Sequence, residues 1–268
     1  MTPLRTSLIV LLALGTLGSS CAPQADRRAE RRAAPKPVES LFSRYIPWGE
    51  HSVETRVGQI GPRVRRLWKA DFSRLGLAYP PAAVVLVALK RERQVEVYAG
   101  PSSYGLKMVR RVNITAASGL PGPKLREGDR QVPEGVYEIE SLNPNSRFHV
   151  ALRLAYPNDF DRRMAGRDHR TKLGGDIMIH GSDQSVGCIA VGDAAAEDLF
   201  VLAADTGIEK VSVVIVPRDF RRTGESEPMP GQPAWVKQLY ADLQLELLSL
   251  PRAASSAATA DPSSPVQK

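Results

Sequence analysis

The sequence predicts a mainly β domain, a sandwich or barrel, with one helix after its most distinctive motif and short helical segments on its flanks. Three observations lead to this prediction. Between residues 82 and 217 the chain has about seven or eight short runs that are rich in valine or alternate apolar with polar residues. Turn-forming glycine and proline separate these runs. Within the same range, only residues 194–207 have the apolar spacing of a helix.

The predicted strands follow one another along this main domain. In order, they are residues 83–89, 94–100, 106–115, 136–142, 148–156, 176–180 and 210–217. The first two enclose the charged turn KRER and should pair as a hairpin, because valine-rich runs on both sides of a polar turn are typical of one. A loop rich in glycine and proline, residues 118–135, separates the third strand from the fourth. The main domain is therefore expected to span residues 82–217.

The flanking segments differ in composition from this domain. Residues 41–81 mix aromatic with basic residues and are expected to form one or two short helices that pack against it. Residues 218–250 begin as a linker and continue, from residue 234, with leucines at helical spacing, which predicts a C-terminal helix. Residues 251–268 are small, polar and rich in proline, and they are expected to be a disordered tail.

The N-terminus predicts export. Arg5 precedes an apolar run, residues 7–18, that has the length of a signal peptide and is too short to span a membrane. The run ends in LGSSC, which resembles the lipobox of bacterial lipoproteins, where the cysteine, here Cys21, becomes the lipidated first residue. The leucine lies one position further from Cys21 than that pattern has it, so ordinary signal-peptidase cleavage nearby is the alternative. With lipidation at Cys21, residues 1–20 are the signal peptide and residues 21–40 a flexible tether. The protein is expected on the periplasmic side of a bacterial envelope membrane.

The formal net charge of +7 does not point to nucleic acid. Part of it lies in RRAERR, residues 27–32, a polar stretch without apolar periodicity or any nucleic-acid-binding motif, so a solvated linker is favoured. A basic protein also suits an anionic polymer of the envelope or a membrane surface. No cofactor is indicated.

The two cysteines lead to the candidate site. If Cys21 is lipidated or removed, Cys188 is left without a disulfide partner in an oxidising compartment. It is either a small buried hydrophobic residue or a nucleophile that needs a nearby base. His180 lies eight positions before it, at the end of a predicted strand. Gly181 and Gly187 allow tight turns between them, and the amides of Gly187 and Cys188 could stabilise an oxyanion.

Two further interpretations concern the same stretch. Ser185 is placed to support the loop, as serine often does in turns. A zinc site would use Cys188, His180 and Asp183 together with His149 or His169, but the sequence has no C-x-x-C or H-x-x-x-H pair and a metal is not favoured. The spacing alone therefore leaves catalysis and structure both open.

Three motifs resemble one known family. HGSDQSVGC, residues 180–188, is similar to the signature of the YkuD-type L,D-transpeptidase catalytic domain, and residues 122–139 resemble a second segment of that family. Residues 145–159 resemble a block of its YafK-like branch, which includes murein L,D-transpeptidases and peptidases. The resemblance covers roughly residues 82–217 and implies a β sandwich or barrel with a helix after the cysteine.

The resemblance also implies roles for individual residues. Cys188 matches the nucleophile and His180 the general base, while Gly187 and Ser185 match the loop around the oxyanion hole. His149 and Tyr156 match recurrent positions without an implied role. Typical members have arginine where this chain has Ala190, which leaves the outcome of the reaction open.

The implied activity is cysteine-dependent acyl transfer on peptidoglycan stem peptides through a thioacyl-enzyme, for cell-wall cross-linking or for attachment of an envelope lipoprotein. The alternative with the same site is a hydrolase that cleaves murein peptides or releases a murein-linked lipoprotein. An alternative of another class is a non-catalytic murein-binding lipoprotein, which would not need both Cys188 and His180.

Overall fold

A computed structural model describes residues 51–223 and 227–251. The predicted signal peptide, the tether with Cys21, residues 41–50 and residues 252–268 lie outside the described residues. No helix in the described part is long and apolar enough to cross a membrane.

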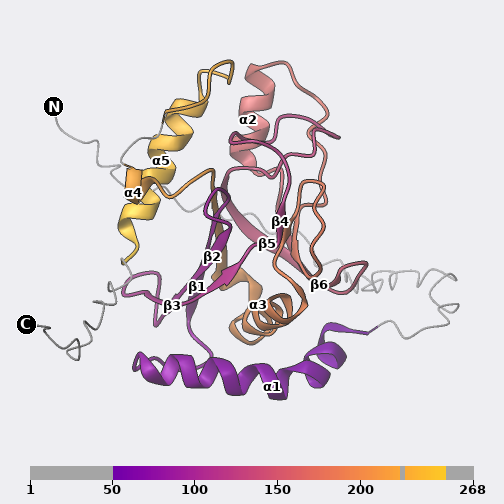
Figure 1. Ribbon diagram of the computed structural model, residues 1–268, viewed down its shortest axis with the longest axis vertical. Helices are drawn as coiled ribbons and strands as arrows, with labels where there is room; N and C mark the ends of the chain where they lie inside the picture. The colour runs from indigo at the N-terminus through magenta and orange to yellow at the C-terminus, as the bar shows by residue number, and fades with distance from the viewer. Residues whose placement is uncertain (1–50, 224–226, 252–268) are drawn as a thin grey trace, which may run out of the picture. The chain divides into compact units, whose positions relative to one another are not determined.

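The described residues form one mixed sheet (Figure 1) with the strand order β3-β2-β1-β9-β5-β6-β7-β8-β4. The strands are β1 (Ala83–Leu89), β2 (Gln94–Gly100), β3 (Lys107–Asn113), β4 (Ala116–Ala117), β5 (Gly135–Ser146), β6 (His149–Leu154), β7 (Met178–His180), β8 (Ile189–Ala190) and β9 (Val211–Val216). Two neighbouring pairs are parallel, β1 with β9 and β7 with β8, and the others are antiparallel. The predicted hairpin is present as β1 and β2, and all seven predicted strands occur.

The helices are α1 (Val53–Arg74), α2 (Asp159–Arg167), α3 (Asp193–Thr206), α4 (Phe220–Thr223) and α5 (Val236–Ser249), and a 3₁₀ turn, η2 (Ile208–Lys210), precedes β9. The helix predicted after the cysteine motif is α3, and the predicted C-terminal helix is α5. The fold is therefore dominated by the sheet, with a few helices, as the sequence predicts.

The N-terminal flank differs from its prediction of one or two short helices, because α1 is a single helix of 22 residues with Pro62 inside it. Val64, Trp68 and Phe72 recur every four positions and are fully buried. Their burial against the sheet and α3 stabilises one continuous helix by more than an interior proline costs. The indole N–H of Trp68 donates to the carbonyl of Asp198 on α3 at 2.8 Å.

Both faces of the central strands are covered. On β1, Leu86 and Ala88 belong to the core shared with α1 and α3, whereas Val87 and Leu89 belong to a second core shared with α5. Alternate residues of a strand point to opposite faces, so a strand covered on both sides must be apolar throughout, as the run AVVLVAL is. The helix α5 therefore packs on the opposite face of the sheet from α1 and α3 (Figure 1).

Candidate active site

The parallel pairing of β7 with β8 brings the two ends of the predicted motif side by side. His180, the last residue of β7, is paired with Ala190 of β8, and Cys188 precedes Ala190 by two positions. Cys188 lies in the bend directly before β8, so this pairing brings its segment beside the strand that ends in His180.

His180 is held as a neutral imidazole. Its side chain is 2% exposed, and Nδ1 lies 2.6 Å from the carbonyl oxygen of Gly181. Because a carbonyl only accepts, Nδ1 carries the proton and Nε2 carries the lone pair. Nε2 is buried and has no hydrogen-bond partner among the described residues. Burial lowers the pKa of His180, and the bond to Gly181 opposes this.

Cys188 is a partly buried thiol that faces the segment before β7. Its Sγ donates to the carbonyl of Asp176 at 3.4 Å, and no hydrogen bond joins it to His180. Burial raises the pKa of Cys188; the amide of Met178 and the charge of Lys124 lower it, and the charge of Asp176 raises it. The sequence predicts a histidine within hydrogen-bond reach of the thiol, whereas in the structure the thiol donates to the Asp176 carbonyl and His180 Nε2 has no partner among the described residues.

Two serines from distant segments support the loop between His180 and Cys188. Ser185 Oγ donates to the carbonyl of Cys188 at 2.6 Å and accepts from the amide of Ser118 at 3.0 Å. Ser118 Oγ in turn accepts from the amide of Gly187 at 2.7 Å and donates to the carbonyl of Arg130 at 2.7 Å. The Gly187 amide, expected to face an oxyanion, is therefore bonded to Ser118 in this structure.

The two glycines of the loop have distinct structural reasons. Gly187 has a φ of +108°, a backbone conformation that side chains rarely adopt. At Gly181, a Cβ would lie 2.4 Å from the Asp193 carboxylate and 2.7 Å from the carbonyl of Phe148, so only glycine fits.

The ligands of the alternative zinc site are not assembled. His149 Nε2 lies 2.7 Å from Glu197 on α3, and His169 is exposed after α2. Asp183 is exposed in the loop. Among the described residues no three His, Cys, Asp or Glu side chains are grouped as a metal site.

Three residues that contact the site were not singled out from the sequence. Ser118 follows β4, a strand of two residues without a readable pattern, and Asp176 contributes its backbone carbonyl, which any residue has. Phe148 stacks on the imidazole of His180 with a centroid distance of 4.6 Å and an interplanar angle of 22°. Its position directly before His149, in a segment similar to a family block, was the one available signal.

The loop predicted at residues 118–135 is fixed by a buried ion pair. Lys90 Nζ lies 2.8 Å from Glu134 Oε1, and the Glu134 side chain is fully buried. Glu134 also accepts from the amide of Gly122 and from the hydroxyl of Tyr240 on α5. A buried carboxylate with three hydrogen-bond donors holds its loop rigidly, so this loop gives the site a stable support.

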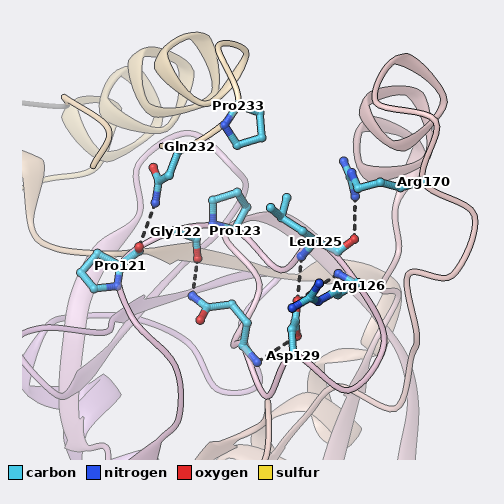
Figure 2. A pocket seen from close by; sticks show the side chains of 10 residues that line it. Pro121, Gly122, Pro123, Leu125, Arg126, Asp129, Arg170, Gln232 and Pro233 are labelled. Carbon is cyan, nitrogen blue, oxygen red and sulfur yellow. Dashed lines mark hydrogen bonds between the residues drawn. The ribbon is translucent and has the colours of Figure 1, made fainter. Parts of the chain in front are cut away.

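A pocket of about 550 Å³ lies on this loop, between residues 121–131, Arg170 and Gln232 (Figure 2). Neither Cys188 nor His180 lines it. Asp129 lines it and binds Lys124 Nζ at 2.6 Å (the cation that lowers the pKa of Cys188). The same loop therefore lines the pocket and carries Lys124, whose charge acts on Cys188.

Comparisons with known proteins bear on this arrangement. The family model of the YkuD L,D-transpeptidase catalytic domain matches residues 82–216. YafK of Escherichia coli strain K12, which is named provisionally as an L,D-transpeptidase, is 31% identical over 145 residues, or 52% of this chain and 55% of that protein. YafK of Escherichia coli O157:H7 gives the same values. The matched region thus spans about half the length of these curated relatives.

Some solved structures are also similar. The helical cell shape determining protein Pgp2 of Campylobacter jejuni is 24% identical, with a TM-score of 0.41 over 65% of this chain and 61% of that chain. Bd1075 of Bdellovibrio bacteriovorus is 17% identical, with a TM-score of 0.38 over 64% of this chain and 57% of that chain. L,D-transpeptidase 1 of Mycobacterium tuberculosis is 16% identical, with a TM-score of 0.30 over 50% of this chain and 62% of that chain.

Proposed function

Because this chain belongs to the YkuD family of L,D-transpeptidase catalytic domains, we propose that it is a cysteine-dependent acyltransferase that acts on peptidoglycan stem peptides. Family membership supports the peptidoglycan-related transpeptidase role. The observation that carries the cysteine mechanism is the pairing of β7 with β8, which sets a neutral imidazole with an unpartnered, buried Nε2 beside the segment that holds the thiol.

The proposed reaction begins from a neutral pair. Burial raises the pKa of Cys188 and lowers that of His180, so near neutral pH the proton rests on sulfur. When substrate binds, rotation of the Cys188 side chain moves Sγ from the Asp176 carbonyl toward His180 Nε2, which removes the proton as general base. Catalytic hydrogen bonds are often absent before substrate arrives.

The proposed acyl transfer proceeds through a thioester on Cys188. Sγ attacks the peptide carbonyl carbon, the carbon–nitrogen bond breaks, and the amine leaves with the proton that His180 took from sulfur. An acceptor amine, or water, then attacks the thioester and restores the thiol. With the Gly187 amide bonded to Ser118, the amide of Cys188 is the donor we assign to the oxyanion. Transfer to an amine would cross-link stem peptides or attach an envelope lipoprotein.

Hydrolysis is the second candidate, and one observation favours it. Ala190 stands where typical members have arginine, and it is 0% exposed between β7 and β4. Alanine presents no positive charge to a second peptide. Nothing at this position would therefore bind a negatively charged acceptor in preference to water. In that case the thioester would be resolved by water, and murein peptides or a murein-linked lipoprotein would be released.

The location follows the N-terminal sequence, which lies outside the described residues. We propose export to the periplasmic side of the envelope with lipidation at Cys21. The test compares the mature protein with its Cys21→Ser variant in a detergent phase partition. Recovery of the unsubstituted protein in the aqueous phase would contradict the lipid anchor.

Incubation with purified disaccharide tetrapeptides, followed by mass spectrometry of the products, tests the activity. New cross-links indicate transfer, and shortened peptides indicate hydrolysis. The variants Cys188→Ala and His180→Asn should lose activity roughly a thousandfold. The matched control is His169→Asn, which changes an exposed histidine outside the site and should keep full activity. Equal activity of Cys188→Ala and the unsubstituted protein would end the nucleophile proposal, and no product from any protein would favour a binding role.

A further inference from the structure

Phe148 connects the candidate base to the rest of the fold. Its ring lies nearly parallel to the imidazole of His180, 4.6 Å from centroid to centroid. With Arg147 it forms the two-residue turn between β5 and β6, since Ser146 pairs with His149 across the hairpin. The orientation of the imidazole therefore depends on where this turn lies.

The turn is held in an uncommon backbone conformation. His149, the residue that follows Phe148, has a φ of +75°, which is rare for residues with a side chain. Such a conformation persists only where surrounding contacts determine it. The contact here is the side chain of His149 itself, whose Nε2 lies 2.7 Å from Glu197 Oε1 on α3.

The same carboxylate binds the N-terminal helix. Glu197 Oε2 accepts from Arg63 of α1 at 2.6 Å, and Arg63 also lies 3.7 Å from Asp198. The chain Arg63–Glu197–His149 thus joins α1, α3 and β6. Of these elements, α1 lies outside the region that the family model matches.

The backbone after His180 packs directly on this turn. A Cβ on Gly181 would lie 2.7 Å from the Phe148 carbonyl and 3.1 Å from His149 Cβ, so the backbone at Gly181 approaches the turn closely. A displacement of Phe148 would therefore reach His180 through both the ring contact and the backbone.

We propose that Phe148 is a positioning residue for His180, and that the Arg63–Glu197–His149 chain holds Phe148 in place, so that α1 is part of the catalytic unit. The proposal rests on the role of His180 as base in the function proposed above. It assigns no contact with substrate to Phe148, His149 or Glu197.

Two variants test the proposal, each with a matched control. Phe148→Leu removes the flat ring, and we expect kcat to fall on the order of tenfold at unchanged KM, because a misplaced base costs rate rather than binding. The control Phe148→Tyr keeps the aromatic ring and should have the kcat of the unsubstituted protein. Glu197→Gln breaks the link to α1 and, like Phe148→Leu, should lower kcat. Its control is Arg65→Gln, which breaks another contact of α1 with α3, the bidentate pair with Asp205, and should leave kcat unchanged.

A second readout does not require turnover. In the Cys188→Ala background, NMR titration of the imidazole nitrogens follows the pKa of His180 directly. Burial lowers this pKa, so loss of the ring in Phe148→Leu should raise it toward about 6.5. The acidic limb of kcat/KM should move to higher pH with it. An unchanged His180 titration in Phe148→Leu would overturn the proposal even if the chain proves not to be a transpeptidase. If the His180 titration is unchanged in Glu197→Gln alone, the proposed role of the Arg63–Glu197–His149 contacts is overturned.

Discussion

At the scale of single residues, strained backbone gathers around the candidate site. Of the non-glycine residues described with positive φ, four contact or border it, namely Arg130, His149, Asp176 and Ser182. Asp176 turns its carbonyl to the thiol, and Arg130 turns its carbonyl to Ser118. Strain of this kind is common at functional sites, where neighbouring contacts outweigh its cost. The thiol and the imidazole are thus each held by backbone carbonyls before substrate binds.

This arrangement predicts the pH dependence of thiol reactivity. In a Cys21→Ser variant, Cys188 is the one cysteine in the chain. Because burial raises its pKa, its alkylation by iodoacetamide should be slow at neutral pH and should rise only above the usual thiol pKa of about 8.5. Mass spectrometry gives the rate, and the urea-unfolded protein supplies the reference. Fast alkylation at pH 6 would instead indicate a preformed thiolate–imidazolium pair.

At the scale of elements, the two flanking helices contribute side chains to the hydrophobic cores. The helix α1 buries Trp68 and Phe72 on one face of the sheet, and α5 buries Leu243 and Leu247 on the other. Tyr240 of α5 also binds the buried carboxylate of Glu134, which holds the loop beside the site. A helix at the far end of the chain therefore supports the same loop that carries Lys124.

Two adjacent leucines of α5 test this directly. Leu247 is fully buried and Leu248 is 52% exposed. Leu247→Ala should lower the free energy of unfolding by about 2–5 kcal/mol, because it leaves a cavity in the core, whereas Leu248→Ala should change it by less than about 0.5 kcal/mol. Urea unfolding followed by circular dichroism measures both. Similar losses for the two would contradict the packing of α5 on the sheet.

The elements also show where sequence reasoning was sufficient. Runs that are rich in valine or alternate apolar with polar residues predicted the seven longer strands, because burial on a pleated surface selects such patterns. Strands β4 and β8 have two residues each and exist only through their neighbours, so no local pattern predicts them. The short, charged helix α2 was missed because it is specified by its capping box, Asn158 with Asp161, rather than by apolar spacing.

The candidate site divides in the same way. The motif itself singled out His180 and Cys188, and the glycines between them fit the positions that their backbones require. The direction of the thiol was not predictable, since it depends on the carbonyl of Asp176. Ser118, Phe148 and Glu197 come from separate segments that meet only in the folded chain, so their part in the site required the structure.

At the scale of the whole molecule, the folded unit extends beyond the family match at residues 82–216. A chain that ends at Pro217 would lack α4 and α5 and would expose Val87, Leu89 and Val214 of the second core. We expect it to lose cooperative thermal unfolding and to bind a hydrophobic dye such as anilinonaphthalene sulfonate. The full chain with Leu248→Ala is the control that alters α5 without removing it. A cooperative transition at the full-length temperature would show that the domain folds alone.

The parallel pair of β1 and β9 also has a consequence for the order of folding. Val84 pairs with Val211, so the middle of the sheet joins segments that are separated by more than a hundred residues. Contacts of such long range must close a large loop before they gain any stabilisation, and they slow folding. When β1 through β8 have been synthesised, the strand with which β1 and β5 both pair is therefore still missing. Until residues 211–216 emerge, β1 and β5 can pair only with β2 and β6, and each has one edge without its partner strand.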